Sequence, residues 1–140
     1  MTTIAASLAD GLMVSDSRCN CGSTWLPATK IYRIGDELIG IAGNVIDEQK
    51  WLKWHRAGRR APRPKMEAFC AIILRKDGLY EADNTGLEML IERGFHAIGS
   101  GGAAAIAVML AGHGAEEAVR IACLVDIGSG GDLQIHRLKG

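Results

Sequence analysis

The chain has 140 residues, and its 16 Lys and Arg side chains balance 16 Asp and Glu side chains, so the formal net charge is zero. A neutral chain has no overall electrostatic attraction to nucleic acid or to an anionic membrane surface. Hydrophobic residues make up 48% of the sequence and charged residues 23%. This composition excludes a disordered chain and predicts one globular domain over residues 1–140.

Three pairs of short apolar runs flank turn residues, which is the pattern of β-hairpins. We expect these hairpins at residues 2–15, 31–42 and 69–82, the first and third with an Asp-Gly turn. Between the second and third, apolar residues at helical spacing predict one amphipathic helix, Val45–Ala57, because glycine and prolines follow it.

The second half of the chain contains a short strand, two neighbouring helices and a closing strand. We expect them at residues 95–98, 101–110, 115–125 and 133–138. Strand hairpins and helices occur in separate groups along the sequence. This order predicts an α+β fold, in which helices cover antiparallel sheets.

Membrane and metal binding are not indicated. The longest apolar stretch, residues 101–112, is shorter than the roughly 20 residues of a membrane span. No basic residue precedes the apolar start of the chain, as it would in a secretory signal, so we predict a cytoplasmic protein. Cys19 and Cys21 have the wrong spacing for a zinc site and no Cys or His pair completes one, so we expect a surface turn there and no metal.

The N-terminus offers one chemically distinctive residue, Thr2 in Met1-Thr2-Thr3. Removal of Met1 would leave a free α-amine and a hydroxyl on Thr2, which are a base and a nucleophile in one residue. The alternative is that Thr2 is simply the first residue of a strand.

A set of short motifs occurs in one order along nearly the whole chain. They are Thr2-Thr3-Ile4, Asp10-Gly11, Asp16-Ser17-Arg18, Lys30-Ile31, Ala42-Gly43, Gly99-Ser100-Gly101-Gly102 and Asp126-Ile127-Gly128-Ser129-Gly130-Gly131. With these motifs the sequence resembles proteasome β-subunits and HslV-type peptidases, which are N-terminal-nucleophile (Ntn) hydrolases. The resemblance implies an αββα sandwich of two antiparallel sheets. One helix is expected to be missing, because a single helix and a basic, proline-containing segment replace a longer helix pair.

The resemblance also assigns roles to three residues near the N-terminus. Thr2 is the expected nucleophile of a threonine peptidase, after removal of Met1. Lys30 is expected beside it, where its positive charge would lower the proton affinity of the hydroxyl and amine, and Asp16 would keep Lys30 charged. An ordinary ion pair is the alternative for Lys30 and Asp16.

Four further residues match the family's site. Gly43 matches the glycine whose backbone N–H forms the oxyanion hole, Ser129 and Asp126 match residues that hydrogen-bond the terminal amine and hydroxyl, and Ser100 matches a serine near the nucleophile. The alternatives are a strand-to-helix turn at Gly43, a glycine turn around Ser129 and a helix N-cap at Ser100.

Substrate-pocket positions follow by counting from the matched Lys30 and Gly43. They are Ala28, Tyr32, Ile41, Val45 and Gln49. This lining is uncharged and mostly apolar, so we expect cleavage after apolar or small residues. The family chemistry requires no cofactor. By analogy we expect peptide or unfolded protein substrates, a homo-oligomeric ring and an ATP-dependent unfoldase as a possible partner, with Trp51 and Trp54 as candidates either for a subunit contact or for core packing.

Two other functions remain open. The chain could be a catalytically inactive ring or scaffold subunit. Alternatively, the basic segment over residues 50–65 could bind nucleic acid or an acidic partner. For such a charge run, a solvated helix face and loop are more common, and no nucleic-acid-binding motif accompanies it.

Overall fold

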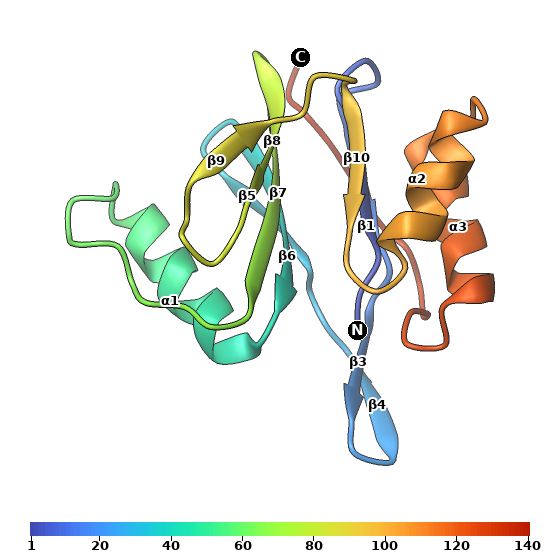
Figure 1. The fold of residues 1–140 in the computed structure, drawn as a ribbon, viewed down its shortest axis with the longest axis horizontal. Coiled ribbons are helices and arrows are strands. Elements are labelled where there is room, and N and C mark those ends of the chain that lie inside the picture. Colours follow the sequence, from blue (N-terminus) through green and yellow to red (C-terminus); the bar gives the residue numbers. More distant parts are fainter.

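Four layers build the fold in the computed structural model, which describes residues 1–140. Two antiparallel sheets face each other, and helices cover their outer faces (Figure 1). Helix α1 (Val45–Arg56) covers one sheet, while α2 (Gly102–Leu110) and α3 (Ala115–Val125) cover the other. This arrangement confirms the predicted αββα sandwich, with a single helix on one of its two outer faces.

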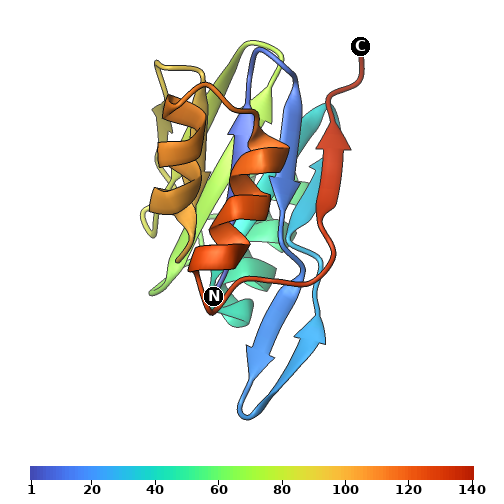
Figure 2. The same ribbon diagram turned by 90° about the vertical axis from the view of Figure 1, so that its right-hand side faces the viewer.

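The sheet under α2 and α3 has four strands in the order β10-β1-β2-β11. The predicted Asp-Gly hairpin joins β1 to β2, and Gly11 adopts the positive φ of 58° that its turn requires. The C-terminal strand β11 pairs with β2, so both ends of the chain contribute to one sheet (Figure 2). The strands are β1 (Ile4–Ser7), β2 (Leu12–Ser15), β10 (Phe95–Ile98) and β11 (Gln134–Arg137).

The second sheet has five strands in the order β5-β6-β7-β8-β9, so each strand lies beside its neighbour in sequence. Short turns join them except between β6 and β7, where α1 is inserted. The strands are β5 (Ile31–Ile34), β6 (Glu37–Gly43), β7 (Phe69–Arg75), β8 (Gly78–Ala82) and β9 (Glu88–Leu90).

Three apolar clusters separate the four layers. In β7, alternate side chains point to opposite faces, so Ile72 and Leu74 pack between the two sheets while Ala71 and Ile73 pack under α1. A central strand that is buried on both faces reads as a continuous apolar run, which explains the sequence of β7. Gly40 of β6 allows the sheets to approach closely, because a Cβ there would meet the Ile4 side chain of the opposite sheet.

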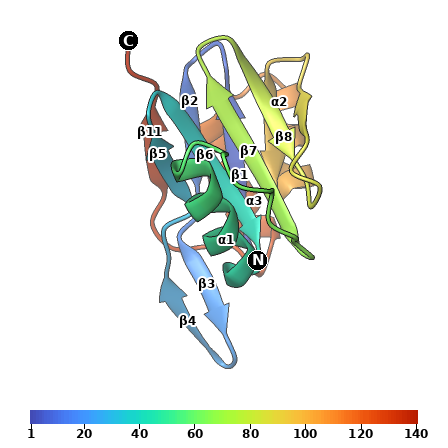
Figure 3. The same ribbon diagram turned by 90° about the vertical axis from the view of Figure 1, so that its left-hand side faces the viewer.

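Two elements were missing from the sequence prediction. The first is a hairpin of β3 (Arg18–Cys21) and β4 (Thr24–Pro27), which extends beyond the sandwich (Figure 3). The expectation of a surface turn at Cys19 and Cys21 is therefore wrong, since both residues belong to a strand; they are free thiols. The second is the short edge strand β9.

The two tryptophans of α1 differ in their surroundings. Trp51 is 1% exposed and stacks on His55 within the cluster under the helix. Core packing is therefore confirmed for Trp51, and a subunit contact through it is excluded. Trp54 is only partly buried. None of the helices has the length and apolarity needed to cross a bilayer.

Candidate active site

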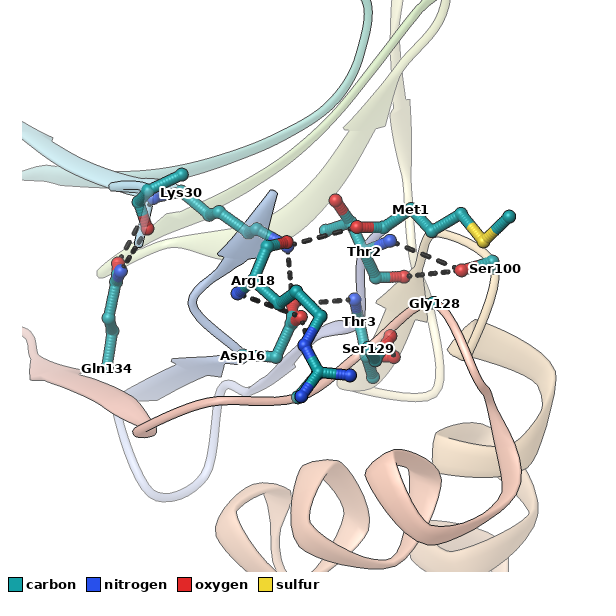
Figure 4. Close-up of polar contacts among 12 residues, drawn as sticks. Met1, Thr2, Thr3, Asp16, Arg18, Lys30, Ser100, Gly128, Ser129 and Gln134 are labelled. Atoms are coloured by element: carbon teal, nitrogen blue, oxygen red, sulfur yellow. Dashed lines mark hydrogen bonds and ion pairs between the residues drawn. The ribbon is translucent and has the colours of Figure 1, made fainter. Parts of the chain in front are cut away.

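A buried ion pair lies next to the N-terminal segment, between the two sheets. The Lys30 ammonium is 2.8 Å from Asp16 Oδ1, and neither side chain is more than 7% exposed (Figure 4). Asp16 follows β2 and Lys30 precedes β5, so one member of the pair comes from each sheet. The expected proximity of Lys30 and Asp16 is present in the structure.

Asp16 is fully buried and is surrounded by donors. Besides Lys30, it accepts hydrogen bonds from the backbone N–H of Thr3 at 3.1 Å and of Gly130 at 3.0 Å. A weaker contact comes from the N–H of Arg18 at 3.4 Å. Both oxygens of the buried Asp16 carboxylate therefore have hydrogen-bond donors, and the Lys30 ammonium is the one charged donor among them.

Lys30 makes two further hydrogen bonds. Its Nζ donates to the backbone carbonyls of Arg18 at 2.6 Å and Met1 at 3.1 Å. Its own backbone N–H donates to the Gln134 side chain on β11, which fixes the start of β5 beside the first sheet. The ammonium is thereby directed at the peptide bond between Met1 and Thr2.

On the other side of Thr2, three polar side chains form a connected chain. The Thr2 backbone N–H donates to Ser100 Oγ at 3.2 Å, and Ser100 donates to Asp126 Oδ2 at 2.6 Å. The same carboxylate oxygen accepts from Ser129 at 2.6 Å, and Ser129 Oγ is 2.7 Å from Thr3 Oγ1. Ser100 therefore contacts Thr2 directly, whereas Ser129 contacts Thr3.

The contact between Thr3 and Ser129 was not anticipated, because sequence matching pointed to Thr2 alone. No pattern in the sequence indicates this contact, because it joins residues at opposite ends of the chain. Asp126 is the common acceptor of the group. Burial raises the pKa of Asp126, but hydrogen bonds from Ser100, Ser129 and the Gly128 N–H outweigh burial and leave it below its usual value.

Two glycines shape the backbone around Thr2. Gly99 has φ of 94°, and a Cβ there would overlap the Thr2 carbonyl oxygen. Gly43, at the end of β6, has φ of 130°, and a Cβ would overlap the Ala68 carbonyl. The N–H of Ile41 points to β5 and donates to Lys30 O. Because alternate N–H groups of a strand point the same way, the Gly43 N–H also points toward the β5 side of β6. Gly43 lies beyond the first residue of β5, so no β5 residue is paired with it.

A cavity of about 350 Å³ opens at this point and brings the expected residues together. Thr2, Lys30 and Gly43 line it with Ala28, Ile41 and Val45, which are three of the five expected pocket positions. The other two positions, Tyr32 and Gln49, do not line the cavity. Counting along the sequence from Gly43 could not determine which side chains of α1 turn inward.

Charged residues also line this cavity, so the expectation of an uncharged lining is wrong. Arg18, Lys30 and Glu48 are all part of its wall. Glu48 accepts a hydrogen bond from the Tyr32 hydroxyl at 2.7 Å. Tyr32 thus contacts a residue that lines the cavity but does not line the cavity itself. Burial raises the pKa of Glu48, and the Tyr32 hydrogen bond and the Lys30 charge oppose that effect.

The site therefore brings together a threonine just before a strand, a lysine that is paired with a buried aspartate, and a glycine N–H in one cavity. A charged ammonium near a hydroxyl stabilises the developing alkoxide, and a directed N–H stabilises an oxyanion. With the Thr2 amine free, this arrangement can perform acyl transfer. No three Cys, His, Asp or Glu side chains are grouped as metal ligands would be.

Solved structures from two organisms share this fold. The structure of HslV from Trypanosoma brucei superposes with a TM-score of 0.72 over 99% of this chain and 100% of that chain, at 24% sequence identity. BPH from Thiobacillus denitrificans, in complex with epoxomicin, superposes with a TM-score of 0.69 over 99% and 100% of the two chains, at 17% identity. A second BPH structure gives 0.66 over 99% and 98%, at 18% identity.

The sequence itself matches no protein-family model and no curated protein. The structural likeness nevertheless confirms the fold predicted from the sequence motifs, because it extends over the whole chain. The fold is that of HslV and BPH.

Proposed function

We propose that this chain is an N-terminal threonine peptidase of the proteasome β and HslV type, formed by one Ntn-hydrolase domain over residues 1–140. The observation that carries the proposal is the buried Lys30–Asp16 pair, which faces the Met1–Thr2 peptide bond inside a cavity that also contains Gly43. A buried ion pair alone contributes little net stability. Its place beside a threonine at a strand start supports a chemical role.

In the proposed reaction, the bond between Met1 and Thr2 is first cleaved, which frees the Thr2 α-amine. The amine takes the proton of the Thr2 hydroxyl, and Oγ1 attacks the carbonyl carbon of a substrate peptide bond. The Gly43 N–H stabilises the oxyanion. The C–N bond then breaks, the leaving amine takes the proton, and water hydrolyses the ester on Thr2 with the same amine as base.

Ser100 is the residue that would hold the free amine, because its hydroxyl already contacts the Thr2 nitrogen and is fixed by Asp126. Asp126 and Ser129 are positioning residues in this scheme. Since Glu48 lies in the cavity wall, the lining no longer supports a preference for cleavage after apolar side chains.

The experiment is an intact-mass measurement of the purified protein before and after treatment with epoxomicin, the compound bound to BPH in its complex. We expect loss of Met1 and one adduct, which peptide mapping places on Thr2. Thr2→Ala is the matched control and should give no adduct while keeping its thermal transition. A chain without Met1 that gives no adduct and cleaves no fluorogenic peptide would refute the proposal and favour the inactive ring subunit.

Assembly is a second part of the proposal. By analogy with the proteasome and HslV family, we propose a homo-oligomeric ring in the cytoplasm that cleaves peptides or unfolded proteins, with an ATP-dependent unfoldase as partner. Native mass spectrometry of the purified chain tests the ring, for which a purely monomeric species at micromolar concentration is the contrary result. Addition of a candidate unfoldase with ATP and an unfolded protein tests the partner.

A further inference from the structure

The basic segment over residues 50–65 is not used by the proposed active site. It contains seven Lys and Arg residues and no Asp or Glu. Two of the seven are occupied within the molecule, because Arg59 pairs with Glu88 and Arg63 donates to the Thr85 carbonyl. The other five make no ion pair, and all five are exposed: Lys50, Lys53, Arg56, Arg60 and Lys65.

A groove of about 280 Å³ lies between α1 and the loop that follows it. This helix and loop lie on the outer side of the sandwich (Figure 1). We call it the basic groove. Its apolar surface comes from Trp54, Ala57, Ala61 and Pro62, and Lys50 and Lys53 line it as well. Lysine stems pack on apolar surface while their ammonium groups stay in water, so the groove combines an apolar interior with positive charge.

The basic groove is already formed in the free chain. The Trp54 indole N–H donates to the Ala61 carbonyl at 2.7 Å, which ties the loop to the helix. At the far end of the loop, the buried Asp47 carboxylate accepts the N–H groups of Glu67 and Ala68, each at 2.8 Å. A preformed groove lowers the conformational entropy lost on binding.

We propose that the basic groove binds an extended acidic segment of a partner protein, with an aliphatic side chain in the groove and flanking carboxylates at Lys50 and Lys53. The interior is made of alanine, proline and indole carbon, which suits an aliphatic group. Neither lysine forms an ion pair within the chain, although the Lys50 charge contributes to lowering the pKa of the Asp47 carboxyl. Carboxylates of an acidic ligand would complement both charges.

Nucleic acid fits this groove less well than an acidic peptide. The Arg59 guanidinium lies 5.3 Å from the Trp54 ring centre and covers one of its faces. The indole N–H is already used by Ala61. Stacking of bases between aromatic faces, which supports binding of single strands, is therefore restricted here.

Fluorescence polarisation with a fluorescein-labelled Asp-Glu-Leu-Leu-Glu-Asp peptide tests the proposal on the full chain. We expect saturable binding that weakens as salt is added, and an affinity lower by about tenfold or more for Lys50→Glu/Lys53→Glu. Lys76→Glu/Lys139→Glu makes the same change of net charge at exposed sites away from the groove and should bind as the parent chain does.

Three results would overturn the proposal. One is equal binding of a peptide in which both leucines are replaced by serine, because the charges alone would then suffice. Another is tighter binding of a single-stranded oligothymidine, which would identify a nucleic-acid site. The third is an equal loss in the Lys76→Glu/Lys139→Glu control.

A further variant fills the groove without changing the charge. Ala57→Phe places a large side chain at an exposed helix end and should weaken peptide binding. Circular dichroism of each variant verifies that it is folded.

Discussion

The molecule contains two networks of polar side chains, and they are built differently. The N-terminal network joins Lys30, Asp16 and the hydroxyls around Thr2, and most of its bonds go to backbone groups. The outer network lies at the edge of α1 and joins charged side chains to each other. Its members are Glu37, His55, Arg59, Arg75 and Glu88.

In the outer network, each charged side chain bonds to another member of the same network. Arg75 pairs with Glu37 and makes two bonds to Glu88, while Arg59 bonds both Glu88 and His55 Nδ1. Because His55 Nδ1 accepts a hydrogen bond, its Nε2 carries the proton that is shared with Glu37. Every charge is matched by a neighbour, which is what a structural network requires. The N-terminal network instead ends at Thr2, whose side chain faces a cavity.

The largest effect on stability is expected for Lys30→Met. This variant leaves the fully buried Asp16 without its counter-ion, and breaking a buried pair on one side costs about 3–5 kcal/mol. Urea unfolding measures the loss, and peptidase activity should disappear with it. Asp16→Asn/Lys30→Met removes the orphaned charge and should recover part of the stability but none of the activity. Equal stability of the single and double variants would contradict a buried, charged Asp16.

Variants of two glycines distinguish the cost of backbone strain from the effect of displacing Thr2. Gly99→Ala and Gly94→Ala both place a side chain at positive φ, at 94° and 76°, which costs roughly 1–2 kcal/mol. Only at Gly99 would the new Cβ also overlap the Thr2 carbonyl, since nothing lies near Gly94. We expect Gly99→Ala to lose about 2 kcal/mol more of its unfolding free energy than Gly94→Ala does. Gly99→Ala should also lose activity, whereas Gly94→Ala should remain fully active. Similar behaviour of both variants in thermal unfolding and in the peptidase assay would contradict the close approach.

Arg75→Met probes the outer network and should be milder than Lys30→Met. Its partners are partly exposed to water, so we expect a loss of about 1 kcal/mol in urea unfolding, with activity unchanged. Arg120→Met, which removes an exposed pair with Glu117 on α3, is the matched control and should have almost no effect. A loss for Arg75→Met as large as that for Lys30→Met would remove the distinction between the two networks.

The pH dependence of stability should report the outer network. Hydrogen bonds from Arg75 lower the pKa of Glu88 from 4.5 to about 2, and those from His55 and Arg75 lower the pKa of Glu37. A lowered folded-state pKa means that the stabilisation is complete above the unfolded value and is lost as the pH falls toward 2. Glu88→Gln should therefore show a shallower decline of urea-unfolding stability from pH 4.5 to 2 than the parent chain. An identical slope would show that Glu88 is not held by these arginines.

The strands and helices that bury an apolar face could be predicted from the sequence, because burial requires a regular spacing of apolar residues. The hairpins that form the two sheets have apolar strands around turn residues, and α1 has helical spacing. The β3–β4 hairpin lacks this pattern because its strands are largely exposed, and backbone pairing across the turn at Gly22 holds it instead. Edge strand β9 has only three residues, too few for a recognisable period.

For the site, the matched motifs placed Lys30, Asp16, Ser100 and Gly43 around Thr2, as the structure has them. The sequence could not show that Ser129 contacts Thr3, or that Glu48 reaches the cavity wall and Gln49 stays exposed. Both depend on side-chain direction, which is set by tertiary contacts such as the hydrogen bond between Tyr32 and Glu48.

The contact between Lys30 and the Met1 carbonyl has a consequence for the timing of chemistry. An ammonium has three protons, and here all three have acceptors: Asp16, the Arg18 carbonyl and the Met1 carbonyl. While Met1 is attached, all three N–H donors of Lys30 are used, and the longest of the three bonds, at 3.1 Å, goes to the residue that blocks the Thr2 nitrogen. In the proposed reaction, cleavage of the Met1–Thr2 bond frees the amine and removes one acceptor of Lys30 in the same event, so the proposed base and the charge that would assist it become available together.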